Sequence, residues 1–339
     1  MQRKNVISYI IKRLLWAIPT LLGVSVLVFS MVHLAPGDPA LAMLGEHANK
    51  EAVHALREQM GLNKPLLEQY YLFVTNAIQG DFGISTLSGE PVIDEFLERF
   101  PATVELSLVA LIFATIIGLL AGIISAVKRY SLFDYLSMST ALAGVSMPVF
   151  WLGLMLIYFF AVNLGWLPVS GRLGYEFDID DVTGFYLIDS ILMQDYEAFW
   201  DVCKHLMLPA LALGTIPMAI IARMTRASMI EVMKEDYVRT ARAKGCTKKQ
   251  VIFIHALKNA LMPVITVIGL MLGTLFAGSI LTETTFSWPG IGKWLVNAVN
   301  QRDFPIIQST TLIIATIFVT VNIIVDLLYA VVNPKVRLT

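Results

Sequence analysis

Long apolar segments alternate with polar segments along the whole chain. Six apolar segments approach or exceed the roughly twenty residues that a helix needs to cross the hydrocarbon core of a bilayer. Pro148 is expected to kink the third segment, and Pro209 and Pro217 interrupt the fourth, which is the shortest. The sequence therefore predicts an all-α polytopic membrane protein with six transmembrane helices, at residues 9–31, 104–127, 136–161, 206–222, 261–281 and 310–332.

The charged residues are distributed unevenly among the polar segments. Cytoplasmic segments of membrane proteins carry an excess of Lys and Arg. Placing both termini inside puts 17 of the 25 basic residues in the cytoplasm and at least 19 of the 26 acidic residues outside. We therefore predict that both termini are cytoplasmic. The hydrophobic content of 56% agrees with a membrane protein, and no basic surface suited to nucleic acid is expected.

The external segments differ in character. Residues 36–101 hold ten acidic and four basic residues. Asn49 is a suitable cap for a helix that Gly61 stops, and Gly80 ends a second helix over residues 66–79, so a small external helical subdomain is predicted. A second external loop, 163–204, is acidic, and a third, 284–308, carries two tryptophans typical of a membrane interface and is a candidate for a partly inserted half-helix. The predicted organisation is 1–35 with the N-terminus and first span, 36–101 as the external subdomain, and 102–339 as a core of five spans.

The most basic stretch lies between the fourth and fifth spans, in the predicted cytoplasmic loop 223–260. Residues 223–258 hold nine Lys or Arg and three acidic residues. Asp236 is a suitable N-cap for a short helix through Lys244, and Gly245 supplies the left-handed residue that ends it. Thr247 and Gln250 fit a capping box that starts a second helix over residues 251–259.

The first of these short helices is predicted to bind a partner. Ala241 and Ala243 are small enough to let another backbone approach, and they lie beside Arg239, Arg242 and Lys244, which can hold acidic groups. The alternative is a solvated, positively charged loop without a partner.

The chain lacks the usual sequence signs of an enzyme. The segment Gly290-Ile291-Gly292-Lys293 is followed by Trp294, where a phosphate-binding loop needs Ser or Thr, so this chain is not expected to hydrolyse ATP. The five histidines form no ligand pair, no G-x-S-x-G elbow occurs, and no cofactor or metal is expected. Cys203 and Cys246 fall on opposite sides of the predicted membrane and cannot form an intramolecular disulfide.

Three carboxylates in or near the spans are candidates for a translocation pathway. Glu105 and Glu283 lie near the outer ends of the second and fifth spans, and Asp326 lies within the sixth. Charged groups are costly in lipid and generally face a bundle interior or an aqueous cavity. The alternative for Glu105 and Glu283 is a wetted interfacial acid, and for Asp326 it is a structural pair with a cytoplasmic Arg or Lys.

Several short motifs in a fixed order cover almost the whole chain. They are Pro36-Gly37-Asp38-Pro39, Gly61-Leu62-Asn63-Lys64-Pro65, Gly80-Asp81-Phe82-Gly83-Ile84-Ser85, Arg239-Thr240-Ala241-Arg242-Ala243-Lys244-Gly245, His255-Ala256-Leu257-Lys258-Asn259-Ala260, Phe286-Ser287-Trp288-Pro289-Gly290 and Asn333-Pro334. With these motifs the chain resembles the permease subunits of peptide-type binding-protein-dependent ABC importers, and the dipeptide branch most closely. The resemblance implies a type I ABC importer permease fold in a bacterial inner membrane and no enzymatic activity in this subunit.

In that family a cytoplasmic coupling helix, related to an E-A-A-x-x-x-G signature, docks in a cleft of the ATPase subunit. The resemblance carries this role to Asp236 and to residues 239–245, with Ala241 matching the second alanine and Gly245 the glycine. The chain departs from the general signature at Arg239, where the signature has Glu, and at Thr240, where it has the first Ala.

The resemblance implies transport by alternating access with several partners. These are a homologous second permease subunit, one or two ABC ATPase subunits, a periplasmic or lipid-anchored solute-binding protein, membrane lipid and a peptide substrate. Dipeptides are the first choice of substrate, and similar permeases carry oligopeptides, haem, nickel complexes or antimicrobial peptides. From another class, a secondary transporter or channel would be expected to show an internal repeat and charges at the membrane centre, and no clear repeat or charge cluster is visible.

Overall fold

The computed structural model describes residues 2–34, 39–44, 49–59 and 61–332, and most of these residues are helical. Within these residues the β-structure is limited to one isolated antiparallel bridge between Ile84 and Pro91. The chain divides into two compact units. The first comprises Met1–Pro101 and Gly290–Thr320, and the second comprises Ala102–Pro289 and Val321–Thr339.

Among the described residues, five helices are long and apolar enough to cross a membrane, and a sixth candidate is a bent pair of helices. The predicted six spans are therefore matched if the bent pair counts as one span. The apolar segments lie within α1 (Gln2–Leu34), α5 (Val92–Val127), the pair α6 (Leu132–Ser146) and α7 (Val149–Leu156) with the π-helical segment η1 (Ile157–Asn163), α9 (Tyr196–Val232), α12 (Leu257–Thr285) and α14 (Phe304–Val332).

The first unit contains the short helices that the glycine pattern predicts. They are α2 (Pro39–Leu44), α3 (Lys50–Gln59) and α4 (Leu66–Ile78). The Asn49 side chain accepts a hydrogen bond from the backbone of Glu51 at the start of α3. Gly61 and Gly80 have φ angles of 68° and 84°, the left-handed conformation that glycine adopts without strain, so both helix ends are confirmed. Met60, the predicted last residue of the first helix, lies outside the described residues.

The same unit contains α13 (Ile291–Gln301), which forms where the sequence suggests a half-helix. Its Trp294 donates a hydrogen bond to Glu95 over 3.1 Å, and the Arg99 guanidinium lies 5.3 Å from the centre of the Trp294 ring. At the turn after α13, the fully buried Asp303 carboxylate accepts from the Ser85 hydroxyl over 2.7 Å and from the Thr86 backbone over 2.9 Å. Asp303 thus fixes the segment before α5 to the start of α14.

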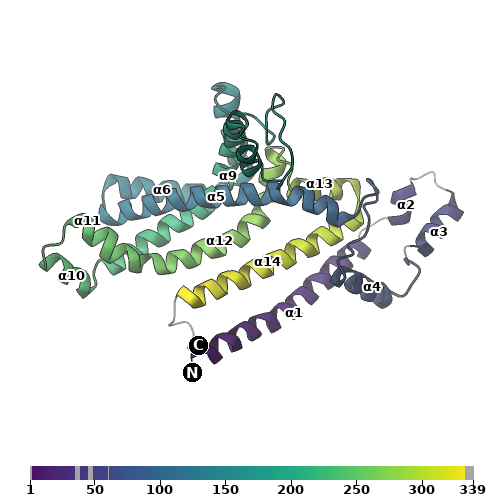
Figure 1. The fold of residues 1–339 in the computed structure, drawn as a ribbon, viewed down its shortest axis with the longest axis horizontal. Helices are drawn as coiled ribbons and strands as arrows, with labels where there is room; N and C mark the ends of the chain where they lie inside the picture. The colour runs from purple at the N-terminus through teal and green to yellow at the C-terminus, as the bar shows by residue number, and fades with distance from the viewer. Residues whose placement is uncertain (1, 35–38, 45–48, 60, 333–339) are drawn as a thin grey trace. The chain divides into compact units, whose positions relative to one another are not determined.

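The second unit is a bundle built on close contacts between α5, α6, α9 and α12 (Figure 1). Glycines make the α5–α9 contact close. A Cβ atom at Gly118 would lie 2.8 Å from the Met218 carbonyl oxygen, and one at Gly122 would lie 2.6 Å from the Ala222 carbonyl oxygen. Gly118 and Gly122 therefore form a face of α5 on which α9 packs closely.

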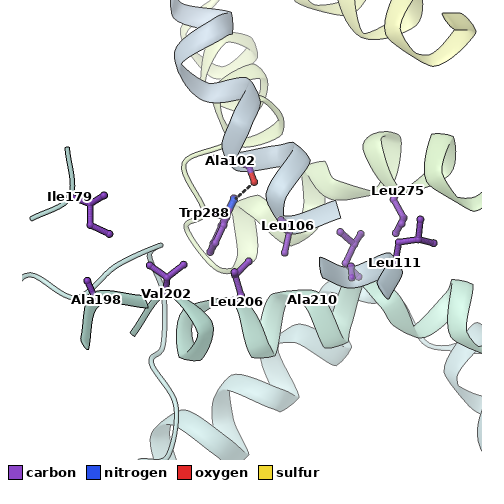
Figure 2. Close-up of a cluster of buried hydrophobic side chains, with 12 residues drawn as sticks. Ala102, Leu106, Leu111, Ile179, Ala198, Val202, Leu206, Ala210, Leu275 and Trp288 are labelled. Atoms are coloured by element: carbon purple, nitrogen blue, oxygen red, sulfur yellow. Dashed lines mark hydrogen bonds between the residues drawn. The ribbon is translucent and has the colours of Figure 1, made fainter. Parts of the chain in front are cut away.

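Trp288 anchors a buried apolar cluster in this unit. Its indole N–H donates to the Ala102 carbonyl oxygen over 2.9 Å (Figure 2). The ring is fully buried among aliphatic side chains of α5, α9 and α12, with Ile179 from the loop before α8 (Tyr186–Leu192) in the same cluster. Because its N–H is hydrogen-bonded, the indole buries a large apolar area without leaving a buried donor unpaired. The cluster therefore holds α5, α9 and α12 together.

Two predicted spans differ from the structure. Pro148 does more than kink the third span, because α6 and α7 are bent by 110° across it. Pro148 lacks an N–H and serves as the N-cap of α7, so the helix restarts in a new direction. The fourth span is not the shortest: α9 has 37 residues and contains both Pro209 and Pro217. Both prolines are buried in the bundle, where packing on their neighbours keeps the helix continuous despite the missing donors.

Candidate functional site

The basic loop forms a short helix, α10 (Asp236–Ala243), directly after α9. The predicted cap is one residue off. Glu235 is the N-cap residue, with extended backbone and no side-chain capping bond, and Asp236 is the first residue of the helix. An acidic residue in the first turn still favours the helix by its interaction with the helix dipole. Lys244 is the C-cap, and Gly245 follows with φ 82°, so the predicted glycine stop is confirmed.

The apolar face of α10 is already occupied. Val238 and Ala241 are buried and pack with Val251 and with the partly buried Val232 and Cys246. Ala241 was expected on the partner-binding surface, whereas in this chain its side chain packs in the same buried cluster as Val251. The helix places residues 238 and 241 on one face, because they are three positions apart.

The other side of α10 and the two residues after it carry three exposed basic side chains. We call the following exposed residues the α10 outer face: Arg239, Thr240, Arg242, Ala243, Lys244 and Gly245. Arg239 makes an exposed contact of 3.3 Å to Asp236, and Thr240 donates to the backbone of Asp236 over 2.9 Å. An ion pair this exposed contributes little to stability, so it leaves Arg239 available to a stronger acceptor.

A second helical segment begins two residues after Gly245. Thr247 accepts from the Gln250 backbone, and the Gln250 side chain accepts from the Thr247 backbone, which confirms the capping box. The helix does not end near residue 259 as predicted. It runs from α11 (Lys248–Gln250) through the π-helical segment η2 (Val251–Ala256) into α12. Asn259 donates to the Tyr237 hydroxyl over 2.7 Å and ties α10 to this continuous helix.

The base of the loop is fixed to three further helices. Ser228 of α9 donates to the Ala260 carbonyl oxygen of α12 over 2.9 Å. Arg226 of α9 donates to both carboxylate oxygens of Asp134, at the start of α6, over 2.6 Å and 2.8 Å. Ala126 of α5 packs with Met229 in the same region. A displacement of α10 would therefore be passed to α5, α6, α9 and α12 together.

A second polar cluster surrounds Glu105 of α5. Glu105 is buried, and one of its carboxylate oxygens accepts two bonds from Arg172, over 3.1 Å and 2.7 Å. The other oxygen accepts from the Leu187 backbone over 2.8 Å. Arg172 also donates to the Gly184 carbonyl oxygen over 2.7 Å, and its guanidinium lies 3.8 Å from the centre of the Tyr186 ring. The expectation of a wetted interfacial acid is therefore wrong for Glu105.

The sequence does not predict the pairing of Arg172 with Glu105, because Arg172 is simply one of two basic residues in an acidic loop. The same loop is fixed by Asp189, which is fully buried and accepts from the Thr183 hydroxyl over 2.6 Å and from the Gly184 backbone over 3.0 Å. Burial raises the pKa of the Tyr186 phenol, which therefore stays neutral beneath the Arg172 guanidinium. The segment from Arg172 to Asp189 is thus an ordered cover on α5 at Glu105.

The other two pathway candidates are placed differently. Glu283 of α12 is fully buried and accepts from the Thr103 hydroxyl of α5 over 2.7 Å, so it is no wetted acid either. Asp326 belongs to α14, and its side chain lies outside the described part of the structure. Glu105 and Glu283 therefore have different hydrogen-bond partners, Arg172 and Thr103. No group of three or more His, Cys, Asp or Glu side chains within the described residues could hold a metal ion.

Two family models match this chain. One, described as the binding-protein-dependent transport system inner membrane component, matches residues 118–338, and the N-terminal model for such membrane components matches residues 6–107. The chain belongs to this family. It is therefore a membrane-spanning permease component of a binding-protein-dependent transport system in the inner membrane.

Several permeases are similar over nearly the full length of this family member. The di/tripeptide permease DppB of Pseudomonas aeruginosa is 54% identical over 332 residues, 98% of this chain and 99% of the relative. The dipeptide permease DppB of Escherichia coli K12 is 50% identical over 335 residues, with the same coverage. The glutathione permease GsiC of Escherichia coli K12 is 44% identical over 331 residues, again 98% and 99%.

A solved structure, that of an amino acid ABC transporter crystallised with histidines, aligns with 72% of this chain and 94% of its own at a TM-score of 0.48 and 15% identity. At that score the similarity supports no argument about this chain.

Proposed function

We propose that this chain is the permease subunit of an ATP-driven ABC importer that carries dipeptides or similar small peptides across the bacterial inner membrane. The observation that carries the proposal is the α10 outer face. The apolar residues of α10 pack inward on Val251, whereas Arg239, Arg242 and Lys244 stay exposed. The apolar face of this short helix is buried within its own subunit, and its exposed face is basic. Such a helix is suited to an acidic cleft on another protein.

The partner in that cleft is an ABC ATPase subunit. This chain has no phosphate-binding loop, so the ATP that drives transport is hydrolysed on one or two separate ATPase subunits. A second, homologous permease subunit completes the pathway, and a periplasmic or lipid-anchored solute-binding protein delivers the substrate. In this arrangement both termini and the loop 223–260 are cytoplasmic. The subdomain 36–101 is external and precedes the core 102–339 in the sequence.

The loop acts as a lever between the ATPase and the spans. Asp236 and residues 239–245 form the docking segment, and Gly245 sets the turn that aims it. The contacts Ser228–Ala260 and Arg226–Asp134 join its base to α12 and α6. Because these helices are packed closely, a movement imposed on α10 shifts them as a body instead of bending the loop.

The substrate assignment rests on the relatives. Those at 50–54% identity are named as dipeptide or di/tripeptide permeases, and the glutathione permease is less similar at 44%. Of the three pathway candidates, Glu105 and Glu283 are buried and hydrogen-bonded. This supports a role in fixing the helix ends beside the pathway, while Asp326 keeps its proposed place on the pathway.

Uptake into proteoliposomes tests the proposal. The chain is reconstituted with its second permease, ATPase and solute-binding subunits, and a labelled dipeptide is supplied with ATP. Uptake is expected only in the complete assembly. Uptake by this chain alone, without ATPase subunits, would show a secondary transporter or channel, and ATP-driven uptake of a non-peptide substrate in preference to dipeptides would refute the substrate assignment only.

A further inference from the structure

The turn between α5 and α6 combines exposed basic, aromatic and aliphatic side chains. Lys128 and Arg129 follow directly after the last residue of α5, and α6 begins three residues later. Both basic side chains are exposed, and neither makes an ion pair within the described residues. Since α5 and the pair beginning with α6 are consecutive candidate spans, this turn lies at a membrane surface.

The turn is rigid. Tyr130 has φ 65°, a left-handed conformation that is unfavourable for a non-glycine residue. Its backbone N–H donates to Asp134 over 3.0 Å, and the Ser131 hydroxyl caps α6 by accepting from the Asp134 backbone. The Arg129 guanidinium lies 4.4 Å from the centre of the Tyr130 ring. The backbone of the turn and the Arg129 side chain are therefore held in place before any ligand arrives.

The acidic residue nearest to the turn in the sequence, Asp134, is already paired with Arg226. Asp134 is the one acidic residue between Glu105 and Glu176 in the sequence. Its buried carboxylate receives both bonds from Arg226. Lys128 and Arg129 form no ion pair with it in the described structure, so both exposed side chains can contact an external anion.

An apolar surface continues from the basic pair along the helices. Leu120 and Ile124 are exposed on α5 at four-residue spacing from Lys128, so all three lie on one face of the helix. In the first turns of α6, Leu132 is 74% exposed and Tyr135 and Leu136 are 60% and 58% exposed. A basic pair above a stripe of exposed aliphatic residues matches the shape of a phospholipid, with a phosphate above acyl chains.

We propose that the α5–α6 turn is a binding site for an anionic phospholipid. The headgroup phosphate is held by Lys128 and Arg129, and the acyl chains lie along Leu120 and Ile124. An anionic lipid is favoured over a protein partner because the basic pair lies at the end of the apolar stripe. This order of charge and apolar surface matches the order of phosphate and acyl chains in a lipid. Arg226 joins Asp134 of this turn to α9, which leads into α10, so the bound lipid also steadies the base of the docking loop.

The test is lipid retention by the transporter, measured by native mass spectrometry. The full chain, purified with its partner subunits, is titrated with phosphatidylglycerol or with phosphatidylcholine. The variant K128Q/R129Q is expected to bind phosphatidylglycerol about thirtyfold more weakly, since each basic residue near an anionic surface contributes about fivefold. Phosphatidylcholine binding is expected to stay the same. A charge-retaining variant, K128R/R129K, is expected to keep most of the affinity for phosphatidylglycerol.

The matched control is K64Q/K204Q, which removes the same charge from two exposed lysines on the predicted outer side. It is expected to bind phosphatidylglycerol like the unmodified protein. Equal retention by K128Q/R129Q and the unmodified protein would overturn the proposal. So would an equal loss in the control, which would indicate net charge alone, or the loss of a partner subunit in place of lipid, which would show that a protein covers this turn.

Discussion

Arg226 donates to both carboxylate oxygens of Asp134, 92 positions away in the sequence, over 2.6 Å and 2.8 Å. The pair joins the last turns of α9 to the first turn of α6. Since α10 follows α9 after only a few residues, this contact is the nearest ionic link between the docking loop and the broken span α6–α7. The link places a fixed point at the base of the proposed lever.

Asp134→Asn should weaken that fixed point. The amide cannot accept two charged hydrogen bonds, and Asp134 is only 2% exposed, whereas the Arg226 side chain is 26% exposed and can regain some water. We expect a loss of about 1–3 kcal/mol in the free energy of unfolding, less than for a fully buried pair. Thermal unfolding in detergent measures it. Asp236→Asn, which breaks an exposed pair, serves as the control and should leave the unfolding temperature unchanged; equal effects of both changes would contradict the assignment.

Gly245→Val should uncouple ATP hydrolysis from uptake while the protein still inserts into the membrane. A Cβ atom at Gly245 meets nothing within 4 Å, so the cost comes only from the left-handed backbone at φ 82°, about 1–2 kcal/mol for an L residue. Gly89→Val is the matched control, because Gly89 has φ 77° and equally open surroundings but lies in the other unit. Uptake per ATP hydrolysed should fall in the first variant only, and normal coupling there would count against the role of the α10 turn.

Arg172→Met should loosen the cover that residues 172–189 form on α5. Within the described residues, it leaves the buried Glu105 carboxylate with the Leu187 N–H as its hydrogen-bond donor, and an uncompensated buried charge costs about 3–5 kcal/mol. Hydrogen exchange of the backbone amides of residues 183–187 should therefore accelerate by about 100-fold or more. Adding Glu105→Gln removes the stranded charge and should recover part of the protection. Faster exchange in the double variant than in the single one would show that Glu105 is not the group that Arg172 neutralises.

Gly122→Ala should disturb the contact between α5 and α9. The added methyl group would lie 2.6 Å from the Ala222 carbonyl oxygen and from the Thr225 Cβ atom, so one helix must move. Overpacking of this kind costs about 1–3 kcal/mol, which thermal unfolding can detect. The control is Gly23→Ala in α1, where the new Cβ meets nothing within 4 Å. An unfolding temperature for Gly122→Ala as high as for the control would contradict the close packing.

The elements that local residue chemistry determines were predictable from the sequence. Gly61, Gly80 and Gly245 end helices because their backbones are left-handed, and Thr247 with Gln250 forms a capping box from side chains three residues apart. Apolar length predicted the spans. These features depend on neighbours within one helical turn, so no knowledge of the tertiary structure was needed.

The features that depend on distant partners were not predictable. Pro209 and Pro217 suggested a short span, but burial of α9 in the bundle keeps the helix continuous. Ala241 looked available to a partner, yet Val251 covers it. The pairing of Glu105 with Arg172 joins residues 67 positions apart, and nothing in the acidic loop distinguished that arginine.

Site-directed cross-linking of α10 tests the central claim most directly. In a background with Cys203→Ser and Cys246→Ser, one cysteine is placed at exposed Ala243 or at buried Val238, and the full transporter is treated with a short thiol-to-amine cross-linker. The account predicts that Ala243→Cys is joined to an ATPase subunit and that the yield changes when ATP binds, while Val238→Cys is not joined. A transporter that is active but in which Ala243→Cys never reaches the ATPase would contradict it.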